Sequence, residues 1–251
     1  DHTLTTPGDL FCATAIVLPG TENVMVVGGD ASREGHAGYG ISDVNLFNPT
    51  THQVTPVESM AYARWYATSI ALPNGQIMVM GGTDGIGAGV ALPDIYTPGV
   101  GWTQLTGATG GGGWYPRMYV NGDGKVVVIS AWGGNVELID PSGNGTREII
   151  GTTPFKSSWT SPSVEYAPGK VLINDDTTGL WSMDFSGATP TFTKVATMPE
   201  ERAYGKMTVM ANGDVLINGG GTQGNSEAGA VKSALIWSPK TGALQQVPSE
   251  D

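Results

Sequence analysis

The sequence predicts an all-β protein, a β-propeller of about five four-stranded blades, and three observations lead to this fold class. A strand–turn–strand pattern recurs along the chain at a period of about 50 residues, which is typical of propeller blades. Glycine is abundant, at 38 of 251 residues, while charged residues make up only 14%. The apolar spacing of an amphipathic helix is sustained nowhere, so short strands and tight turns fit this chain and long helices do not.

The clearest copy of the repeat lies between Arg64 and Gly82 and reads RWYATSIALPNGQIMVMGG. It holds two short strand patterns, TSIAL and QIMVM, joined by Pro73-Asn74-Gly75. Proline presets φ and Asn-Gly tolerates positive φ, so this tripeptide predicts a β-hairpin. The pair Gly81-Gly82 ends the second strand where the backbone must turn without a Cβ.

Five such units follow one another in what we interpret as one domain, residues 1–251. Each unit gives a strand, a turn that usually contains glycine, a strand rich in Val, Ile, Leu or Met, a loop, and two further strands. In every unit but the fourth, the third strand ends on a polar residue followed by Pro, as in FNP, YTP, IDP and WSP. The units cover approximately residues 9–57, 62–106, 113–150, 158–196 and 200–248. A β-sandwich is the alternative, but sandwiches do not repeat a sequence pattern at a fixed period.

The number of units raises the question of how a ring would close, because Kelch-type propellers more often have about six or seven blades. The chain also stops at Val247–Asp251, where another Arg-aromatic strand is due. Blades at an open end would expose strand edges, which favour association. We therefore expect this chain to be part of a seven-bladed ring, with the remainder in the same precursor or in a second chain.

Charge and composition exclude some partners and indicate a compartment. The net charge of −11 and the pI near 4.5 argue against nucleic acid and anionic membranes. No stretch approaches the ~20 apolar residues needed to span a bilayer. One cysteine allows no internal disulfide, and the chain begins at Asp1, as a mature product or an excerpt would. Low lysine, abundant Thr, Gly and Asn, and the sequon Asn144-Gly145-Thr146 indicate a secreted or cell-surface protein.

The candidate chemistry begins with Cys12 and Tyr66. Each stands at the head of the inner strand of its unit, Cys12 after Phe11 and Tyr66 after Arg64-Trp65. Inner strands of neighbouring blades lie side by side near the propeller axis, so these two side chains are expected to come close. The alternative is simple packing, because a free cysteine is among the most buried residue types.

Several stretches resemble one known family. DLFCATAIVLPG and MAYARWYATSIALPNGQIMVMGG look like the first propeller blades of the galactose oxidase and glyoxal oxidase family, and WYPRMYVNGDGKVVV and ERAYGKMTVMANGDVLINGGGTQG resemble later blades of bacterial members. The resemblance covers essentially the whole chain. It implies a thioether between the Cys12 sulfur and the Tyr66 ring, and a copper ion bound by the Tyr66 oxygen.

The same resemblance implies an activity. Members of this family oxidise a primary alcohol or an aldehyde and pass the electrons to dioxygen, which gives hydrogen peroxide. Sulfur donation lowers the potential for oxidation of the phenol, and imidazole and phenolate ligands suit copper. The expected function is therefore that of a secreted copper radical oxidase acting on a small alcohol, an aldehyde or a carbohydrate.

The sequence also departs from the family pattern. The family's copper site needs a Tyr-His dipeptide and a second histidine, whereas this chain has only His2, His36 and His52, none in such a motif. The tetrapeptide Arg202–Gly205 has glycine where the family motif has its histidine. This chain is thus expected to supply one copper ligand, Tyr66, while the others lie outside it.

Two further positions are carried over from the family as substrate-binding residues. Arg117, in Trp114-Tyr115-Pro116-Arg117, resembles the family's substrate-facing arginine; an ion pair between blades is the alternative. Asp84 matches the position of an indole that covers the thioether in galactose oxidase, so galactose is not the expected substrate. Trp65 or Trp114 would then take over as the cover, unless both simply pack between blades.

The acidic turns 121–124 and 174–176 are candidates for a calcium site with oxygen ligands, although ordinary turn chemistry explains them as well. The sequence favours an enzyme, a copper radical oxidase. The alternative is a non-catalytic Kelch scaffold that binds protein or glycan, with Cys12 and Tyr66 unlinked.

Overall fold

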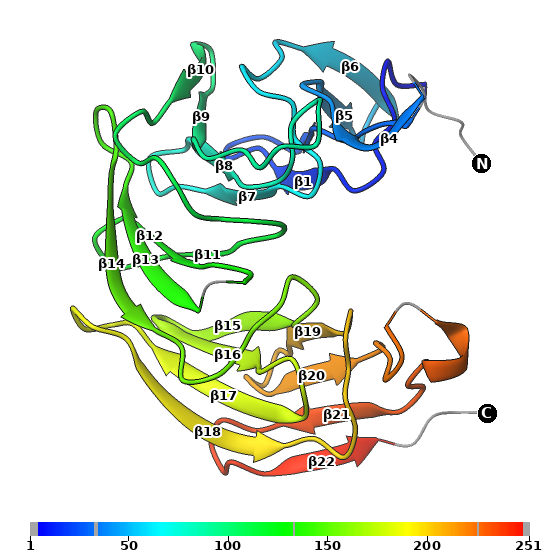
Figure 1. Cartoon of the computed structure of the whole chain (residues 1–251), viewed down its shortest axis with the longest axis vertical. Helices are drawn as coiled ribbons and strands as arrows, with labels where there is room; N and C mark the ends of the chain where they lie inside the picture. Colours follow the sequence, from blue (N-terminus) through cyan, green and yellow to red (C-terminus); the bar gives the residue numbers. More distant parts are fainter. Residues whose placement is uncertain (1–4, 33–34, 133, 225, 248–251) are drawn as a thin grey trace. The chain divides into compact units, whose positions relative to one another are not determined.

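The structure is a computed structural model, and it describes residues 5–32, 35–132, 134–224 and 226–247. Within these residues the strands form five four-stranded antiparallel sheets, one for each repeat of the sequence (Figure 1). Among the described residues the one helix in the order of elements is a short 3-10 turn, Glu227–Gly229. The predicted all-β propeller is therefore confirmed. His2 and the residues after Val247 lie outside the described residues.

We number the sheets blades 1 to 5 in chain order. Blade 1 contains β1 (Thr14–Val17), β2 (Val24–Val27), β5 (Val44–Asn48) and β6 (Gln53–Val57), and its long loop adds the pair β3 (Asp30–Ala31) and β4 (His36–Gly40). Blade 2 contains β7 (Thr68–Ala71), β8 (Ile77–Met80), β9 (Asp94–Thr97) and β10 (Gly101–Gln104). Blade 3 contains β11 (Arg117–Val120), β12 (Val126–Ile129), β13 (Asn135–Asp140) and β14 (Thr146–Thr152).

Blade 4 contains β15 (Ser163–Ala167), β16 (Lys170–Asn174), β17 (Gly179–Asp184) and β18 (Thr191–Thr197). Blade 5 contains β19 (Lys206–Val209), β20 (Val215–Asn218), β21 (Ala234–Trp237) and β22 (Leu244–Val247). The chain divides into two compact units. The first ends at Ala131 and also includes Glu137–Glu148; the second consists of Trp132–Val136 and the chain from Ile149 onward. The interpretation of the chain as one domain stays a prediction.

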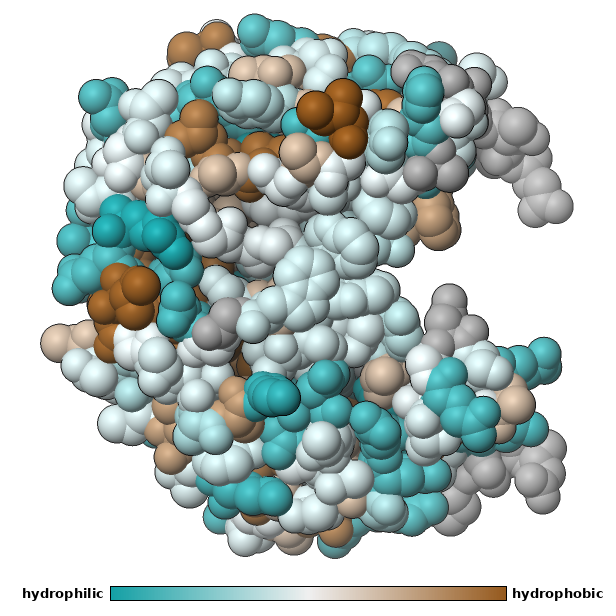
Figure 2. Space-filling model, viewed as in Figure 1, coloured by the Kyte–Doolittle hydropathy of each residue, from teal (hydrophilic) through white to brown (hydrophobic). Residues whose placement is uncertain are grey.

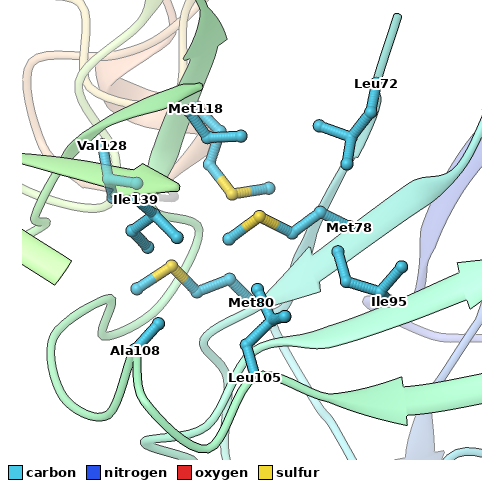
Figure 3. Packing of buried hydrophobic residues seen from close by; sticks show 10 residues of the cluster. Leu72, Met78, Met80, Ile95, Leu105, Ala108, Met118, Val128 and Ile139 are labelled. Atoms are coloured by element: carbon cyan, nitrogen blue, oxygen red, sulfur yellow. The ribbon is translucent and has the colours of Figure 1, made fainter. Parts of the chain in front are cut away.

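The core of the first unit lies between its blades, because β8 has an apolar side chain at every position. Ile77 and Val79 face blade 1 and pack with its Met25 and Val27. Met78 and Met80 point the other way, toward blade 3, where they meet Met118, Val126, Val128 and Ile139 (Figure 3). All four residues of β8 are at most 1% exposed. A strand buried on both faces reads as a continuous apolar run, as β8 does.

The second unit follows the same rule. Leu172 and Leu180 of blade 4 pack with Val215, Ile217 and Trp237 of blade 5. Tyr166 lies edge-on against Trp237, with ring centroids 5.1 Å apart. Bulky aliphatic and aromatic side chains from two sheets thus make one core.

The predicted hairpin at Pro73-Asn74-Gly75 is confirmed. The N–H of Leu72 donates to the Gln76 carbonyl at 2.8 Å, the Asn74 side chain accepts from the N–H of Gln76 at 3.1 Å, and Gly75 has φ +85°. Figure 2 shows that, on the face in view, hydrophobic residues form small separate patches among more polar ones. No helix in the described part of the chain is long and apolar enough to cross a membrane.

Candidate functional site

The candidate site of the first unit lies where the inner strands begin, at Cys12, Tyr66 and Tyr115, which we call the strand heads. The N–H of Tyr66 donates to the Cys12 carbonyl at 3.3 Å, and the N–H of Tyr115 donates to the Tyr66 carbonyl at 2.8 Å. Main-chain hydrogen bonds therefore connect the head of blade 2 to that of blade 1, and the head of blade 3 to that of blade 2. The main chains of Cys12 and Tyr66 are therefore adjacent, while a contact between their side chains stays a prediction.

The three heads share an unusual backbone. Their φ angles are +59° for Cys12, +66° for Tyr66 and +46° for Tyr115. A residue other than glycine pays roughly 1–2 kcal/mol for the left-handed conformation. Three such residues next to one another therefore carry backbone strain, which packing elsewhere must offset. Backbone strain of this kind is often found at functional sites.

One consequence of the left-handed backbone is the stacking of two consecutive rings. In a regular strand neighbouring side chains point to opposite faces. At Tyr66 the chain turns instead, and the Trp65 and Tyr66 rings stack with centroids 3.7 Å apart and planes 13° from parallel. The indole of Trp65 thus covers the Tyr66 ring, the place that the sequence assigned to either Trp65 or Trp114.

Blade 3 adds two rings to this stack. Trp114 meets Trp65 and Tyr66 edge-on, with centroids 5.7 and 5.2 Å away. The Tyr115 ring lies 4.8 Å from that of Tyr66, tilted by 32°. Offset and edge-on aromatic pairs stabilise each other by ~0.5–1.5 kcal/mol beyond the area they bury. The result is a cluster of four aromatic rings beside the only cysteine of the chain.

Tyr115 is a site residue that the sequence analysis missed. Burial raises the pKa of its phenol, and a hydrogen bond to the Cys12 side chain raises the pKa further. Tyr115 is therefore a neutral phenol at pH 7 whose side chain is hydrogen-bonded to that of Cys12 and whose ring contacts that of Tyr66. A signal was present, because the dipeptide Trp-Tyr occurs at 65–66 and again at 114–115, at the same place in two units.

Cys12 is half-buried and forms no disulfide. Whether its sulfur joins Tyr66 stays a prediction.

Asp84 is half-buried, and its carboxylate holds its own loop. Oδ1 accepts hydrogen bonds from the N–H groups of Ile86 and Ala88, both at 2.9 Å. The main chain of Asp84 also accepts the N–H of Gly40 at 2.8 Å. This residue shapes the loop after β8, while its predicted part in binding substrate is untested.

Arg117 begins β11 and is only 8% exposed. Its side chain lies inside the first unit instead of extending into solvent. Neither the substrate-facing role nor the ion pair between blades is tested by this placement, and both stay predictions.

The acidic turns considered for calcium use their oxygen atoms within the chain. The Asn121 side chain accepts the N–H of Asp123 at 3.1 Å and that of Lys125 at 2.9 Å. Asp175 accepts from Thr177, from Gly179 and, at 3.0 Å, from the indole N–H of Trp181. These are turn-stabilising bonds of the ordinary kind.

The described residues contain no group of three or more His, Cys, Asp or Glu side chains that could hold a metal ion. His36 stacks on Tyr39 with centroids 5.6 Å apart, and His52 lies in the turn between β5 and β6. Tyr66 fits as one phenolate ligand, but the described residues do not supply the imidazole partners of a copper ion. A copper site on these residues would need ligands from elsewhere.

The second unit has strand heads of its own at Thr160 and Tyr204. The N–H of Tyr204 donates to the Thr160 carbonyl at 3.0 Å, and Tyr204 has φ +63°. Its ring meets Trp159 edge-on at 5.2 Å. Beside them the Asp176 carboxylate accepts the hydroxyl of Ser158 at 2.5 Å and those of Thr160 and Ser161 at 3.3 Å. The N–H to carbonyl bond between strand heads is thus repeated in the second unit, with threonine in place of cysteine.

The comparisons with known proteins concern the fold. No protein-family model and no curated protein matches the sequence. Among solved structures, a novel fungal alcohol oxidase with catalytic diversity among the AA5 family, in complex with copper, is similar with a TM-score of 0.82 and 19% identity. The match covers 97% of this chain and 54% of that one, so this chain spans about half the length of the oxidase. The structure of YjhT is similar with a TM-score of 0.71 and 15% identity, over 97% of this chain and 85% of that one. At these identities the likeness shows the propeller fold alone.

Proposed function

We propose that this chain is the propeller part of a secreted copper radical oxidase that oxidises a primary alcohol or an aldehyde with dioxygen. For an alcohol, RCH2OH and O2 give RCHO and H2O2, so two electrons and two protons move from carbon and oxygen to dioxygen. The observation that carries the proposal is the strand-head cluster, in which a main-chain hydrogen bond joins Cys12 and Tyr66 and the Trp65 ring covers that of Tyr66. The fold of a copper-bound AA5 alcohol oxidase supports it.

Two features of the cluster support a tyrosyl radical at Tyr66. A thioether on the ring would donate electron density and lower the oxidation potential of Tyr66. The Trp65 ring, stacked at 3.7 Å, excludes water from one face of the phenol. Copper, when bound, would supply a one-electron acceptor and a Lewis acid beside the Tyr66 oxygen. The described residues hold no group of three or more His, Cys, Asp or Glu side chains that could hold a metal ion, and we propose that the remaining ligands lie outside these residues.

The test is a peptide map of the protein isolated from its natural source without reductant. Formation of the crosslink replaces the S–H of Cys12 and a ring C–H of Tyr66 by a C–S bond, and dioxygen takes up the two hydrogens as hydrogen peroxide. We expect one branched peptide that contains both residues and is lighter than the sum of its parts by these two hydrogens. A Cys12 that is fully alkylated by iodoacetamide in native material would overturn the proposal.

A matched pair of variants tests whether the crosslink in the peptide map depends on Tyr66. Tyr66→Phe keeps the ring but removes the oxygen, so we expect Cys12 to become alkylatable. Tyr204→Phe changes the equivalent strand head of the second unit, which has no cysteine beside it, and should leave the branched peptide intact. Loss of the crosslink in both variants would point to a general effect on folding and not to the chemistry at Tyr66.

A non-catalytic scaffold that binds protein or glycan is the second candidate. It is favoured by one observation: the carboxylate of Asp84, a residue carried over as substrate-binding, accepts hydrogen bonds within its own loop. This candidate predicts an alkylatable Cys12 and no copper in protein isolated from its source, so the same peptide map separates the two. The secreted location that we propose for either one is supported by the exposed Asn144 in its sequon, and mapping of N-glycans on that residue tests it.

A further inference from the structure

Tyr115 is a tyrosine at a backbone position that favours glycine. Its φ is +46°, a conformation that glycine adopts without strain. The run Gly110–Gly113 just before it has positive φ at all four positions. A glycine at position 115 would therefore suit the backbone better than a tyrosine does. Strain that is kept at one residue points to a function of its side chain.

The Tyr115 side chain makes two contacts at the strand heads. Its phenol oxygen is hydrogen-bonded to the Cys12 side chain. Its ring lies 4.8 Å from the ring of Tyr66 and is tilted by 32°. A neutral phenol has one O–H to donate, and a cysteine sulfur accepts hydrogen bonds weakly. Tyr115 therefore contacts both residues that the proposed crosslink joins.

The main chain and the neighbouring rings hold Tyr115 in place. Its N–H donates to the Tyr66 carbonyl at 2.8 Å. The residue before it, Trp114, meets the rings of Trp65 and Tyr66 edge-on, with centroids 5.7 and 5.2 Å away. None of these contacts involves the sulfur of Cys12. The phenol is thus a fixed group that can orient the cysteine side chain.

The sulfur of Cys12 needs such an orienting group. Its position depends on χ1 alone, which has three staggered minima, and the main-chain bond to Tyr66 does not select among them. A C–S bond can form only when the sulfur comes within about 3–3.5 Å of the Tyr66 ring in the right orientation. A hydrogen bond to Tyr115, whose own ring contacts that of Tyr66, keeps the sulfur beside these rings.

The second unit has a related arrangement built from other side chains. The hydroxyl of Thr160, a strand head, donates to the Asp176 carboxylate at 3.3 Å. Asp176 has a φ of +63°, so it too is a non-glycine residue with a left-handed backbone. In each unit a side chain on a left-handed residue therefore binds the side chain of a strand head. In the first unit that strand head is the cysteine.

We propose that Tyr115 is a positioning residue for the crosslink between Cys12 and Tyr66, and that its phenol O–H holds the Cys12 sulfur beside the Tyr66 ring. The inference rests on the proposed function, because it concerns the thioether of that site. In the step, the S–H of Cys12 and one ring C–H of Tyr66 are replaced by a C–S bond. Dioxygen takes up the two electrons and two protons as hydrogen peroxide. Tyr115 contributes no atom to the product.

The first test compares the crosslinked fraction of Cys12 in Tyr115→Phe and in the unchanged protein, both produced in the natural source organism. Phenylalanine keeps the ring contact with Tyr66 and removes the oxygen that holds the sulfur. We expect the crosslinked fraction at a fixed time after synthesis to fall about tenfold, because misplaced reacting atoms react slowly. Tyr204→Phe removes the hydroxyl of a strand head with φ +63° in the second unit and should leave the fraction unchanged.

Cleavage before aspartate identifies the ring that is linked to Cys12. Asp84 and Asp94 lie between Tyr66 and Tyr115, so the two tyrosines fall in different peptides. The proposal expects the Cys12 peptide to be joined to the Tyr66 peptide alone. A link to Tyr115 would overturn the proposal, because Tyr115 would then be the reacting ring. Equal crosslinked fractions in Tyr115→Phe and the unchanged protein would overturn it as well.

The second test measures the sulfur before it reacts. Protein produced without dioxygen keeps Cys12 as a thiol, because the step has no oxidant. Without the hydrogen bond the sulfur samples its three rotamers, so iodoacetamide should alkylate Cys12 about threefold faster in Tyr115→Phe than in the unchanged protein. Tyr204→Phe should match the unchanged protein. Equal rates in all three would mean that the phenol does not hold the sulfur.

A second variant covers the case in which Tyr115→Phe folds poorly. Tyr115→Gly suits the φ of +46°, so it removes the backbone strain together with the phenol. The crosslinked fraction should fall as far as in Tyr115→Phe, and a normal fraction would contradict the proposal. An unchanged protein without any crosslink would end the oxidase proposal, and the alkylation rates would still decide whether Tyr115 holds the sulfur. A crosslink that does not depend on Tyr115 would end this inference alone.

Discussion

Blades 2 and 5 carry the same Arg-x-Tyr motif at their strand heads, yet the two arginines are held differently. Arg64 and Asp94 form an ion pair at 2.7 Å, with both side chains fully buried, and Arg64 also donates to the Gly81 carbonyl at 2.8 Å. Arg202 is equally buried but makes no ion pair among the described residues. It donates to the Gly219 carbonyl at 3.2 Å and to the carbonyl and hydroxyl of Ser233 at 2.7 and 3.0 Å.

This difference separates two tasks of the arginine. Binding the carbonyl of the first glycine after the second strand is common to both blades, so the guanidinium fixes the turn in each. Of these two arginines, only Arg64 has a carboxylate within ion-pair distance among the described residues. Burial lowers the pKa of both arginines; Asp94 opposes that effect in Arg64, and the charge of Glu200 opposes it in Arg202. The Asp94 carboxylate therefore compensates the desolvation of the charge on Arg64, while the main-chain bonds set the geometry.

The largest expected effect is that of breaking the buried pair. Arg64→Met leaves Asp94 buried without its counter-ion and should lower the free energy of unfolding by about 3–5 kcal/mol. Arg202→Met leaves only carbonyl and hydroxyl acceptors and should cost about 1–3 kcal/mol. Urea denaturation measures both. The double variant Arg64→Met/Asp94→Leu removes both charges and should recover most of the loss; failure to recover would mean that the main-chain bonds, and not the ion pair, dominate.

The next effect concerns the two glycines that these arginines bind. Gly81 and Gly219 have φ of +77° and +63°, so alanine at either position should cost about 1–2 kcal/mol of backbone strain. At Gly81 the new Cβ would also press on the Gly113 oxygen, 2.5 Å away, and add ~1 kcal/mol or more. Thermal unfolding of the two variants should rank Gly219→Ala above Gly81→Ala. Equal destabilisation would mean that a Cβ at Gly219 meets as close a contact as one at Gly81.

The smallest effect is expected for the more exposed ion pair between Lys125 and Asp140. It tests whether burial explains the large effect expected at the Arg64–Asp94 pair. Hydrogen bonds from Ser142 and Lys125 lower the pKa of Asp140 to about 2, from 3.8. A carboxyl with a lowered folded-state pKa stabilises the fold above its unfolded pKa and loses that stabilisation as the pH falls from about 4 to about 2. Asp140→Asn should cost at most ~1 kcal/mol at pH 7, because the Lys125–Asp140 pair is exposed. Urea unfolding at pH 7 and pH 2.5 should show that the difference between Asp140→Asn and the unchanged protein becomes smaller in acid; a difference that stays constant would mean that it comes from the turn and not from the charge of Asp140.

Much of the fold could be predicted because its signals are local. The Pro73-Asn74-Gly75 hairpin depends on backbone preferences of three residues, and the repeat period depends on four strands that pair with their chain neighbours. The boundary of the third unit was placed at residue 150, while β14 ends at Thr152. The extra pair β3 and β4 in the long loop of blade 1 was not predicted, because it depends on pairing within a region without strand periodicity.

The candidate site was only partly predictable. The placement of Cys12 and Tyr66 at neighbouring strand heads follows from the repeat. The stacking of Trp65 on Tyr66 does not, because it depends on a left-handed residue that no glycine marks in the sequence. Tyr115 was missed for a related reason: its contact with Cys12 joins residues from blades 1 and 3, and side-chain contacts across that distance in sequence leave no local pattern.

The hydrogen bonds between strand heads use only main-chain atoms, so they place no demand on the side chains that the heads carry. Cys12, Tyr66 and Tyr115 occupy these positions in one unit, Thr160 and Tyr204 in the other, and the same N–H to carbonyl bond joins neighbours in each. Mutation can therefore exchange a thiol, a phenol or a hydroxyl there while the sheets keep their arrangement. Evolution of a new activity in such a protein requires substitutions at a few strand heads, without any change in the framework that presents them.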